Sequence, residues 1–266
     1  VALIVIAGII WYLEKQKSAR TSVESNPLGR IEVSNEPMPS NVTSSQDRSA
    51  LLKQKAAMFP SGHELVGIQG YINTDTFRLA DLVGKKVILV DFWTYTCINC
   101  LRTLPYLNAW YEKYKDKGLV IVGVHTPEFE FEKNYDNVAK AVKDLGIHYP
   151  VVLDSNRATW DAYQNRYWPR EYLIDIDGYI VHDKIGEGDY DSTERAIQQA
   201  LEERRAVLGT NESIDASITA PKDMIPMDSS RIGSRETYFG SDRNEYLGNG
   251  TKGTAGTQTL SLPQRI

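Results

Sequence analysis

The chain has 266 residues, of which 41% are hydrophobic, enough to bury one good core. Its formal net charge is −5 and it has no run of Lys and Arg, which argues against a nucleic-acid partner. It contains two cysteines, and they lie three positions apart.

The chain begins with thirteen apolar residues, VALIVIAGIIWYL, which give way abruptly to the charged stretch EKQKSAR. At 1.5 Å per residue they span about 20 Å of a roughly 30 Å hydrocarbon layer, so we expect residues 1–13 to be part of a transmembrane anchor. The alternatives are a signal peptide, which lacks its small-residue cleavage site here, and a buried helix, which has nothing to pack against in the next stretch. Residues 14–57 are polar and rich in turn formers, and we expect a flexible linker there.

Between residues 58 and 205, short apolar runs alternate with helical patterns. In chain order we expect strands over residues 65–72, 85–93, 119–125, 150–154, 171–176 and 179–185, and helices over residues 97–117, 130–145, 158–167 and 192–208. Strands that alternate with helices predict a largely parallel sheet, and the turn Asp177-Gly178 adds antiparallel pairing. The sequence therefore predicts an α/β domain with a mixed central sheet flanked by helices.

Both cysteines lie in the stretch DFWTYTCINC, residues 91–100. Such a CxxC pair can be a redox couple, half of a zinc site or a structural disulfide. Zinc normally needs four ligands at short repeated spacings, but the histidines are scattered singly, at His63, His125, His148 and His182. A disulfide across a two-residue gap closes almost no loop and would stabilise the fold little. A redox couple without a metal is the best interpretation.

The two cysteines differ in their expected positions. A strand that ends near Trp93 and a helix that begins near Cys97 place the Cys97 sulfur at a helix N-terminus, where unpaired N–H groups favour a thiolate. Cys97 is thus expected to be the nucleophile. Cys100 lies one turn further along, shielded, and is expected to resolve the mixed disulfide. Pro105 should bend the same helix.

The stretch DFWTYTCINCLRTLP resembles the active site of thioredoxin-fold proteins, and residues 62–203 resemble the TlpA-like oxidoreductases. The phrases TYTCINCLRTLPYL, GVHTPEFEFEK and RYWPREYLIDIDG are most similar to the thioredoxin-like domain of DipZ-type proteins. The resemblance implies a thioredoxin fold over residues 58–205, a cis-proline at Pro169, and no cofactor besides the redox-active disulfide Cys97–Cys100. Residues 206–232 are expected to be a linker, and residues 233–266 the start of a DipZ-like C-terminal module or a disordered tail.

Several other residues near the CxxC motif are candidates for a role. Asp91 is a carboxylate in the apolar run VILVDF, so its pKa should be raised, and it is expected to take the proton of Cys100. His125, in the segment HTPEFEFE, lies on the same edge, but a lone loop histidine is usually solvated. Four aromatic residues are candidates for an apolar lip that docks a substrate polypeptide, although aromatics beside a strand are more often core: Trp93, Tyr95, Tyr167 and Trp168.

These features predict a membrane-tethered thiol-disulfide oxidoreductase, single-pass in the cell membrane, with its catalytic domain on the extracytoplasmic face. Its expected partners are oxidised protein substrates and, from the resemblance, a CcdA/DsbD-like membrane electron donor, so we expect reduction. One alternative is a copper chaperone that uses Cys97, Cys100 and a histidine such as His125. Another is a thiol peroxidase, for which Thr94 and Cys97 give a TxxC motif, but Asp91 stands where its proline is expected.

Overall fold

The computed structural model describes residues 45–225, 248, 249, 259 and 261. The chain divides into two units, Val1–Asp223 and Met224–Ile266, and the helices and strands of the described residues belong to the first unit. The predicted anchor, residues 1–13, lies outside the described residues, as do most of residues 233–266. Within the described part of the chain, no helix has both the length and the apolar character needed to cross a membrane.

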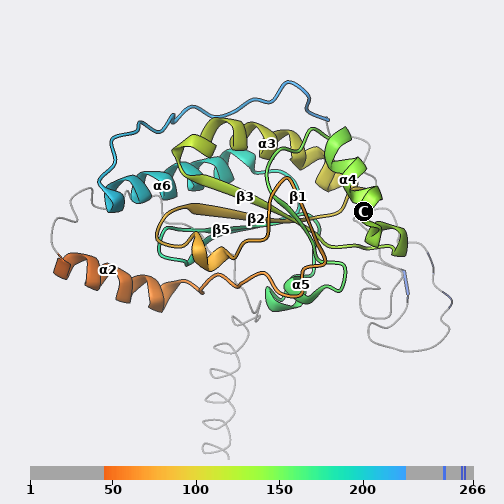
Figure 1. Ribbon diagram of the computed structural model, residues 1–266, viewed down its shortest axis with the longest axis horizontal. Coiled ribbons are helices and arrows are strands. Elements are labelled where there is room, and N and C mark those ends of the chain that lie inside the picture. Colours follow the sequence, from red (N-terminus) through yellow and green to blue (C-terminus); the bar gives the residue numbers. More distant parts are fainter. Residues whose placement is uncertain (1–44, 226–247, 250–258, 260, 262–266) are drawn as a thin grey trace, which may run out of the picture. The chain divides into compact units, whose positions relative to one another are not determined.

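A six-stranded mixed sheet forms the centre of this first unit (Figure 1). Its strand order is β1-β4-β3-β2-β5-β6. The strands are β1 (Gly70–Ile72), β2 (Val87–Trp93), β3 (Leu119–His125), β4 (Val151–Leu153), β5 (Arg170–Ile174) and β6 (Ile180–Ile185). Strands β2, β3 and β4 are parallel, whereas β1, β5 and β6 pair antiparallel to their neighbours. The predicted mixed sheet is confirmed, and the predicted turn before β6 holds Gly178 at φ +88°.

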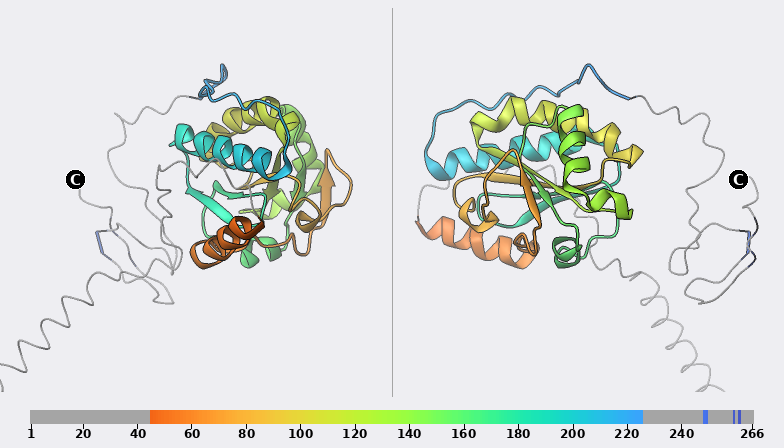
Figure 2. Two further views of the ribbon diagram at one scale, coloured as in Figure 1. Left: turned by 90° about the vertical axis from the view of Figure 1, so that its left-hand side faces the viewer. Right: turned by 45° about the vertical axis from the view of Figure 1, so that its right-hand side comes forward.

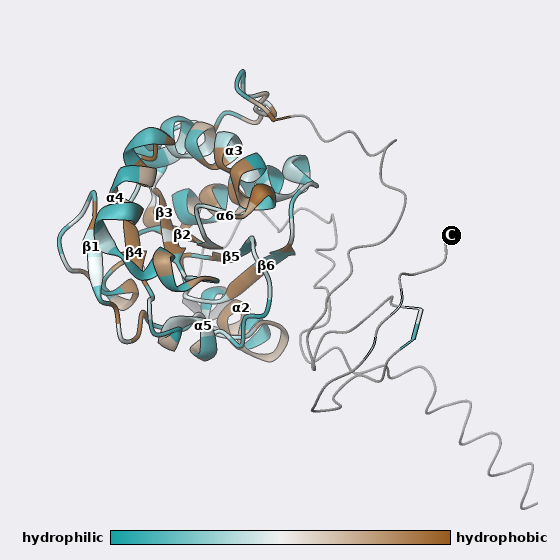
Figure 3. Ribbon diagram, turned by 90° about the vertical axis from the view of Figure 1, so that its right-hand side faces the viewer, coloured by the Kyte–Doolittle hydropathy of each residue, from teal (hydrophilic) through white to brown (hydrophobic). Residues whose placement is uncertain are grey.

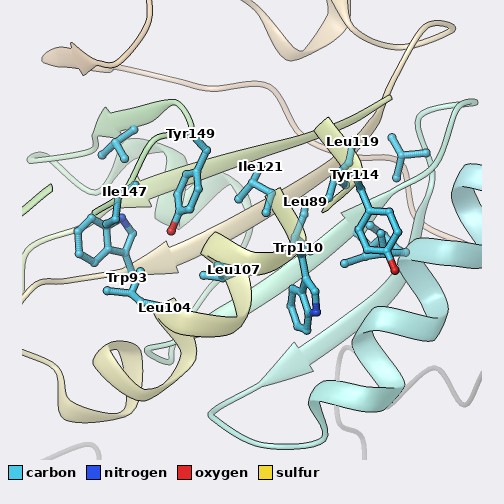
Figure 4. Packing of buried hydrophobic residues seen from close by; sticks show 14 of the residues in the cluster. Leu89, Trp93, Leu104, Leu107, Trp110, Tyr114, Leu119, Ile121, Ile147 and Tyr149 are labelled. Atoms are coloured by element: carbon cyan, nitrogen blue, oxygen red, sulfur yellow. The ribbon is translucent and has the colours of Figure 1, made fainter. Parts of the chain in front are cut away.

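Alternating side chains of the sheet supply two cores. In β2, Leu89 and Trp93 face the helices α3 (Ile98–Tyr114), α4 (Tyr135–Asp144) and α6 (Tyr190–Leu208). The side chains that alternate with them, Ile88, Val90 and Phe92, face α5 (Ala158–Ala162) on the other side. Figure 3 shows the hydrophobic colour concentrated on the strands, and Figure 4 shows buried side chains filling the space between the sheet and α3. Every residue of β2 is buried, as its apolar run predicts.

Several predicted elements are shorter than expected. The strand predicted over residues 65–72 is restricted to β1, and the helix predicted over residues 158–167 to α5. The helix predicted over residues 130–145 is interrupted, because the Asn134 side chain accepts hydrogen bonds from the backbone N–H groups of Asp136 and Asn137 and starts α4 there. Before it, residues Glu130–Lys133 form the short 3₁₀ helix η3.

Part of the predicted flexible linker is folded onto the domain. Residues Ser45–Met58, at the end of the interval 14–57, form helix α2, which lies away from α3 (Figures 1 and 2). Its Lys55 side chain is buried and its ammonium contacts the carboxylates of Asp175, at 2.6 Å, Asp177, at 2.8 Å, and Glu203. These ion pairs join α2 to the β5–β6 turn and to α6, so the linker prediction is wrong for residues 45–57.

The segment after α6 is also bonded to the domain. The backbone carbonyl of Asp215 accepts a hydrogen bond from the Tyr114 hydroxyl, at 3.1 Å, and that of Ser217 accepts one from Gln198, at 3.0 Å. The buried Glu194 carboxylate accepts bonds from the Thr219 backbone N–H, at 2.7 Å, and hydroxyl, at 2.5 Å. The first part of the predicted linker 206–232 is therefore a strap (residues 209–223) across α3 and α6.

Candidate active site

The two cysteines lie at the carboxyl end of β2, where α3 begins. Cys97 has an extended backbone and is the N-cap of α3, with its Sγ accepting a hydrogen bond from the Cys100 backbone N–H, at 3.3 Å. A hydrogen bond from the Cys100 side chain, joined by the backbone N–H groups of Cys100 and Asn99, lowers the pKa of the Cys97 thiol, although burial and Glu128 oppose this. The Cys97 sulfur is thus half-buried at a helix N-terminus that stabilises a thiolate.

Cys100 lies in the opposite environment. Its side chain is buried among the core residues between the sheet and α3. Burial, then the hydrogen bond and charge of Cys97, and then Asp91 raise the pKa of the Cys100 thiol well above its ordinary value. One cysteine is therefore accessible and readily ionised, and the other is shielded and holds its proton.

Behind the cysteines lies a buried acid, Asp91 of β2. Both carboxylate oxygens lack a hydrogen-bond partner, and the residue is 1% exposed. Burial, then the neighbouring Glu171 and Cys97, raise the pKa of Asp91 well above its ordinary value, which is the direction predicted from the sequence. Glu171 of β5 lies directly opposite Asp91 in the antiparallel register and is also buried. Sequence reasoning missed Glu171, although a charged residue in the apolar run EYLIDI was the available signal.

The same edge of the sheet carries the predicted cis-proline. The Trp168–Pro169 peptide bond is cis, as expected, and Pro169 directly precedes β5, which runs antiparallel to β2. Trp168 is half-buried, and its indole Nε1 donates to the Thr126 carbonyl just after β3, at 3.0 Å. The loop before β5 is thereby attached to the loop after β3, on the edge where Cys97 lies.

Only part of the predicted aromatic lip is exposed. Trp93 is completely buried in the core, so the structure corrects its assignment as a docking residue. Tyr95 is half-buried, stacks on the His125 ring at 5.5 Å and donates its hydroxyl to the Phe131 carbonyl, at 3.4 Å. Tyr167 is exposed. The side chains at the surface of this edge are therefore Tyr95, Tyr167 and part of Trp168.

An aromatic and acidic loop (residues 127–133), which sequence reasoning did not single out for docking, adjoins the cysteines. Phe129 and Phe131 are about half exposed, and their rings stack at 5.6 Å. Glu132 is buried and accepts hydrogen bonds from the Thr96 hydroxyl, at 2.5 Å, and the Phe129 backbone N–H, at 2.9 Å. Glu132 thus holds the loop against the turn that leads into Cys97. A pocket of ≈ 370 Å³ lies beside it, lined by residues 127–130, Lys133 and residues 155–157.

His125 is buried, contrary to the expectation of a solvated histidine. Its Nε2 lies 3.3 Å from the Thr94 hydroxyl, and burial lowers its pKa to about 4. It does not form a close group of potential metal ligands with Cys97 and Cys100. Among the described residues, the only such group of three is Asp175, Asp177 and Glu203, and the Lys55 ammonium already contacts all three carboxylates.

Comparison with known proteins extends these observations. The redoxin family profile, described as Redoxin, matches residues 67–201. Protein DipZ of Mycobacterium bovis is 45% identical over 205 residues, which cover 76% of this chain and 29% of DipZ. Thiol-disulfide oxidoreductase YkuV of Bacillus subtilis is 30% identical over 140 residues, which cover 53% of this chain and 93% of YkuV. The chain thus spans less than a third of the DipZ sequence but nearly all of YkuV.

One solved structure agrees in fold as well as in sequence. A thioredoxin-like protein, solved in solution in its oxidised form, is 28% identical, with a TM-score of 0.50. The match covers 55% of this chain and 97% of that protein. The thioredoxin-like arrangement of strands and helices predicted for residues 58–205 is therefore observed.

Proposed function

This chain belongs to the redoxin family and is a thiol-disulfide oxidoreductase of the thioredoxin-like type, and from this premise we propose that it reduces disulfide bonds in other proteins through Cys97 and Cys100. The observation that carries the proposal is the contrast between the two thiols. Cys97 is accessible and its pKa is lowered, whereas Cys100 is buried and its pKa is raised.

The proposed reaction has two steps. The Cys97 thiolate attacks a substrate disulfide, forming a mixed disulfide and releasing the first substrate thiolate. Cys100 then gives its proton to Asp91, and its thiolate attacks Cys97 Sγ; the Cys97–Cys100 disulfide forms as the bond between Cys97 and the substrate breaks. The second substrate thiolate leaves and is protonated by water. Two electrons pass from the dithiol to the substrate.

A substrate polypeptide would dock on the edge that carries Cys97. Tyr95, Trp168 and Pro169 border that edge, and the stacked rings of Phe129 and Phe131 extend its apolar surface. The proposal places oxidised protein segments with apolar side chains there, next to the reactive sulfur. The buried Trp93 contacts the His125 ring, on which Tyr95 stacks, and so contributes to this surface only indirectly.

The proposed setting is the extracytoplasmic face of the cell membrane. Its support is the apolar segment 1–13, proposed as part of a single-pass anchor, and the similarity to DipZ.

The proposed electron donor is a CcdA/DsbD-like membrane protein that returns the Cys97–Cys100 disulfide to the dithiol. In cells, alkylation trapping should find the cysteines mostly as thiols, and mostly as a disulfide once the donor is deleted. A pair that is mostly oxidised with the donor present would contradict the proposed direction.

Trapping of reaction intermediates tests the proposed mechanism. Cys100→Ser should accumulate mixed disulfides with substrate proteins, because the first step proceeds and the second cannot, whereas Cys97→Ser should accumulate none. Non-reducing electrophoresis followed by identification of the trapped proteins provides the measurement. Accumulation with Cys97→Ser and not with Cys100→Ser would reverse the two roles. Accumulation with neither variant, and no reduction of insulin by the unmodified chain, would contradict the function itself.

A further inference from the structure

A row of ionisable side chains crosses the sheet beneath the cysteines. Asp91 of β2 pairs with Glu171 of β5, and Glu171 pairs in turn with Lys184 of β6. On its other side, Asp91 pairs with Gly123 of β3, which has no side chain. The exposed fraction rises along the row, from 1% at Asp91 and 2% at Glu171 to 17% for the Lys184 side chain. The row thus leads from the buried site to the edge of the sheet.

The carboxyl groups of Asp91 and Glu171 lie directly opposite each other on the two strands. Residues directly opposite on antiparallel strands have Cβ atoms about 4.5 to 5.5 Å apart, with their side chains on one face of the sheet. Both Asp91 oxygens and Oε2 of Glu171 lack hydrogen-bond partners. Two buried carboxylates at such a separation repel each other strongly, so they do not both ionise at the same pH.

We propose that Glu171 is a positioning residue for the resolution step: its carboxylate, opposite Asp91, holds a proton on Asp91 and so sets the pH at which Asp91 can accept the proton of Cys100. This inference rests on the proposed function for its consequence in turnover, but the interaction between the two carboxyl groups belongs to the free protein.

The electrostatic environment decides which carboxyl group ionises first. Burial raises the pKa of Glu171 to about 7, opposed by the charge of Lys184 and a hydrogen bond with Thr193. Burial and the charges of Glu171 and Cys97 all raise the pKa of Asp91. Neither of these two residues is a cation that could favour its ionised form, as Lys184 does for Glu171. Glu171 therefore loses its proton first. Its negative charge then adds to the cost of ionising Asp91.

Other titratable groups face this pair from the surrounding elements. From α3 and its N-cap, Cys100 and Cys97 interact with Asp91. From the segment before β4, Tyr149 interacts with both carboxyl groups, and from α6, Tyr190 interacts with Glu171. His182 of β6 contacts Thr193, 3.1 Å from its hydroxyl. All of these groups are thiols, phenols or an imidazole, whereas Glu171 is a carboxyl group and the direct strand partner of Asp91.

The test is the titration of Asp91 in the full reduced chain, followed by carboxyl ¹³C NMR. Glu171→Gln should lower the midpoint of Asp91 by about 1 pH unit or more, because the like charge is gone. Glu171→Asp, which keeps the charge, should leave the midpoint closer to that of the unmodified chain. Glu194→Gln is the matched control, since it removes another buried carboxylate, one bonded to Lys113 and Tyr114, and should leave Asp91 unchanged.

The same variants should change the pH profile of the resolution step. In single-turnover measurements, Glu171→Gln should move the rising limb to lower pH with the same plateau. The proposal is overturned if Glu171→Gln leaves the midpoint of Asp91 unmoved. It is also overturned if Glu171→Gln lowers the resolution rate at every pH, because Glu171 would then carry protons itself. If Glu171→Gln does not fold, the unmodified chain can still be tested. The ¹³C NMR titration curve of Asp91 must then show a second inflection where Glu171 titrates, and a single inflection overturns the proposal. The NMR titration needs no substrate, so its outcome is independent of whether the chain reduces disulfides.

Discussion

Buried ionisable side chains are the residues on which this site depends. The raised pKa of Asp91 could be predicted because a carboxylate inside the apolar run VILVDF is expected to be buried away from water. The apolar run EYLIDI gave the same kind of signal for Glu171, but its pairing with Asp91 depends on strand register. The burial of His125 could not be predicted in this way, because it depends on residues distant in the sequence. His125 is buried by Trp93 and Tyr95, which contact its ring at 5.2 Å and 5.5 Å.

Asp91→Asn is the direct test of the proton acceptor. The amide keeps the shape of the side chain but cannot accept the Cys100 proton, so the resolution step at neutral pH should slow by about 10²-fold. The rate of mixed-disulfide decay, measured by rapid acid quenching between pH 6 and 8, provides the readout. Asp116→Asn, which makes the same exchange at an exposed position, is the control for the loss of one carboxylate. A decay rate that is unchanged by Asp91→Asn would make Asp91 a structural residue only.

His125 should make the fold sensitive to acid. Its pKa is about 4 in the folded chain and about 6.5 when unfolded, so between these values the unfolded state binds more protons. The buried neutral His125 therefore contributes its full share to the free energy of unfolding above pH 6.5. This share, about 3 kcal/mol, is lost as the pH falls towards 4. Urea unfolding of His125→Gln should show a weaker decline over this range. His148→Gln, at an exposed site, should decline like the unmodified chain.

At the scale of single elements, the start of α3 is the feature most directly encoded in the sequence. The strand VILVDF and the following CxxC placed Cys97 at a helix N-terminus, and the structure makes it the N-cap. Helix α2 is the contrary case. Its apolar residues do not gather on one face, so nothing local indicated that it packs on the domain. It is held by ion pairs to residues at least 120 positions away, which no local pattern can show.

Removal of the buried ammonium should release α2. Lys55→Met leaves Asp175, Asp177 and Glu203 facing one another without their shared cation, which should reduce the free energy of unfolding by about 3 to 5 kcal/mol. Hydrogen exchange should then become faster throughout residues 45–58. Lys53→Met, on the exposed side of the same helix, is the matched control and should change neither quantity. Unchanged exchange in Lys55→Met would mean that other contacts hold α2.

At the scale of the whole molecule, the order of strands and helices in the domain and the location of the two cysteines could be predicted from the sequence. The positions in the chain at which the folded unit begins and ends could not be predicted. Hydrophobic periodicity ends near residue 208, but the strap (residues 209–223) continues through polar hydrogen bonds to α3 and α6. Such bonds join residues whose pairing depends on the finished fold, so they leave no pattern in the sequence.

The strap should contribute measurably to stability. A chain that ends at Leu208 loses the Thr219 hydrogen bonds to the buried Glu194 carboxylate and the Ser217 bond to Gln198, which should lower the free energy of unfolding by about 2 to 4 kcal/mol. A chain that ends at Asp223 retains all of these bonds and should be as stable as the full chain. Urea denaturation of the two chains gives the comparison. Equal midpoints would show that the strap adds no stability.

The two edges of the sheet bear on how the protein behaves when many copies are crowded together. On one edge β1 has three residues, and on the other β6 carries His182, Asp183 and Lys184 in succession. The backbone N–H of Ile180 is already bonded to the Pro60 carbonyl, at 2.8 Å. Short or charged edges give little template for pairing with a strand of another molecule. The described sheet is thus protected against edge-to-edge aggregation, which would suit the proposed encounters with oxidised protein substrates.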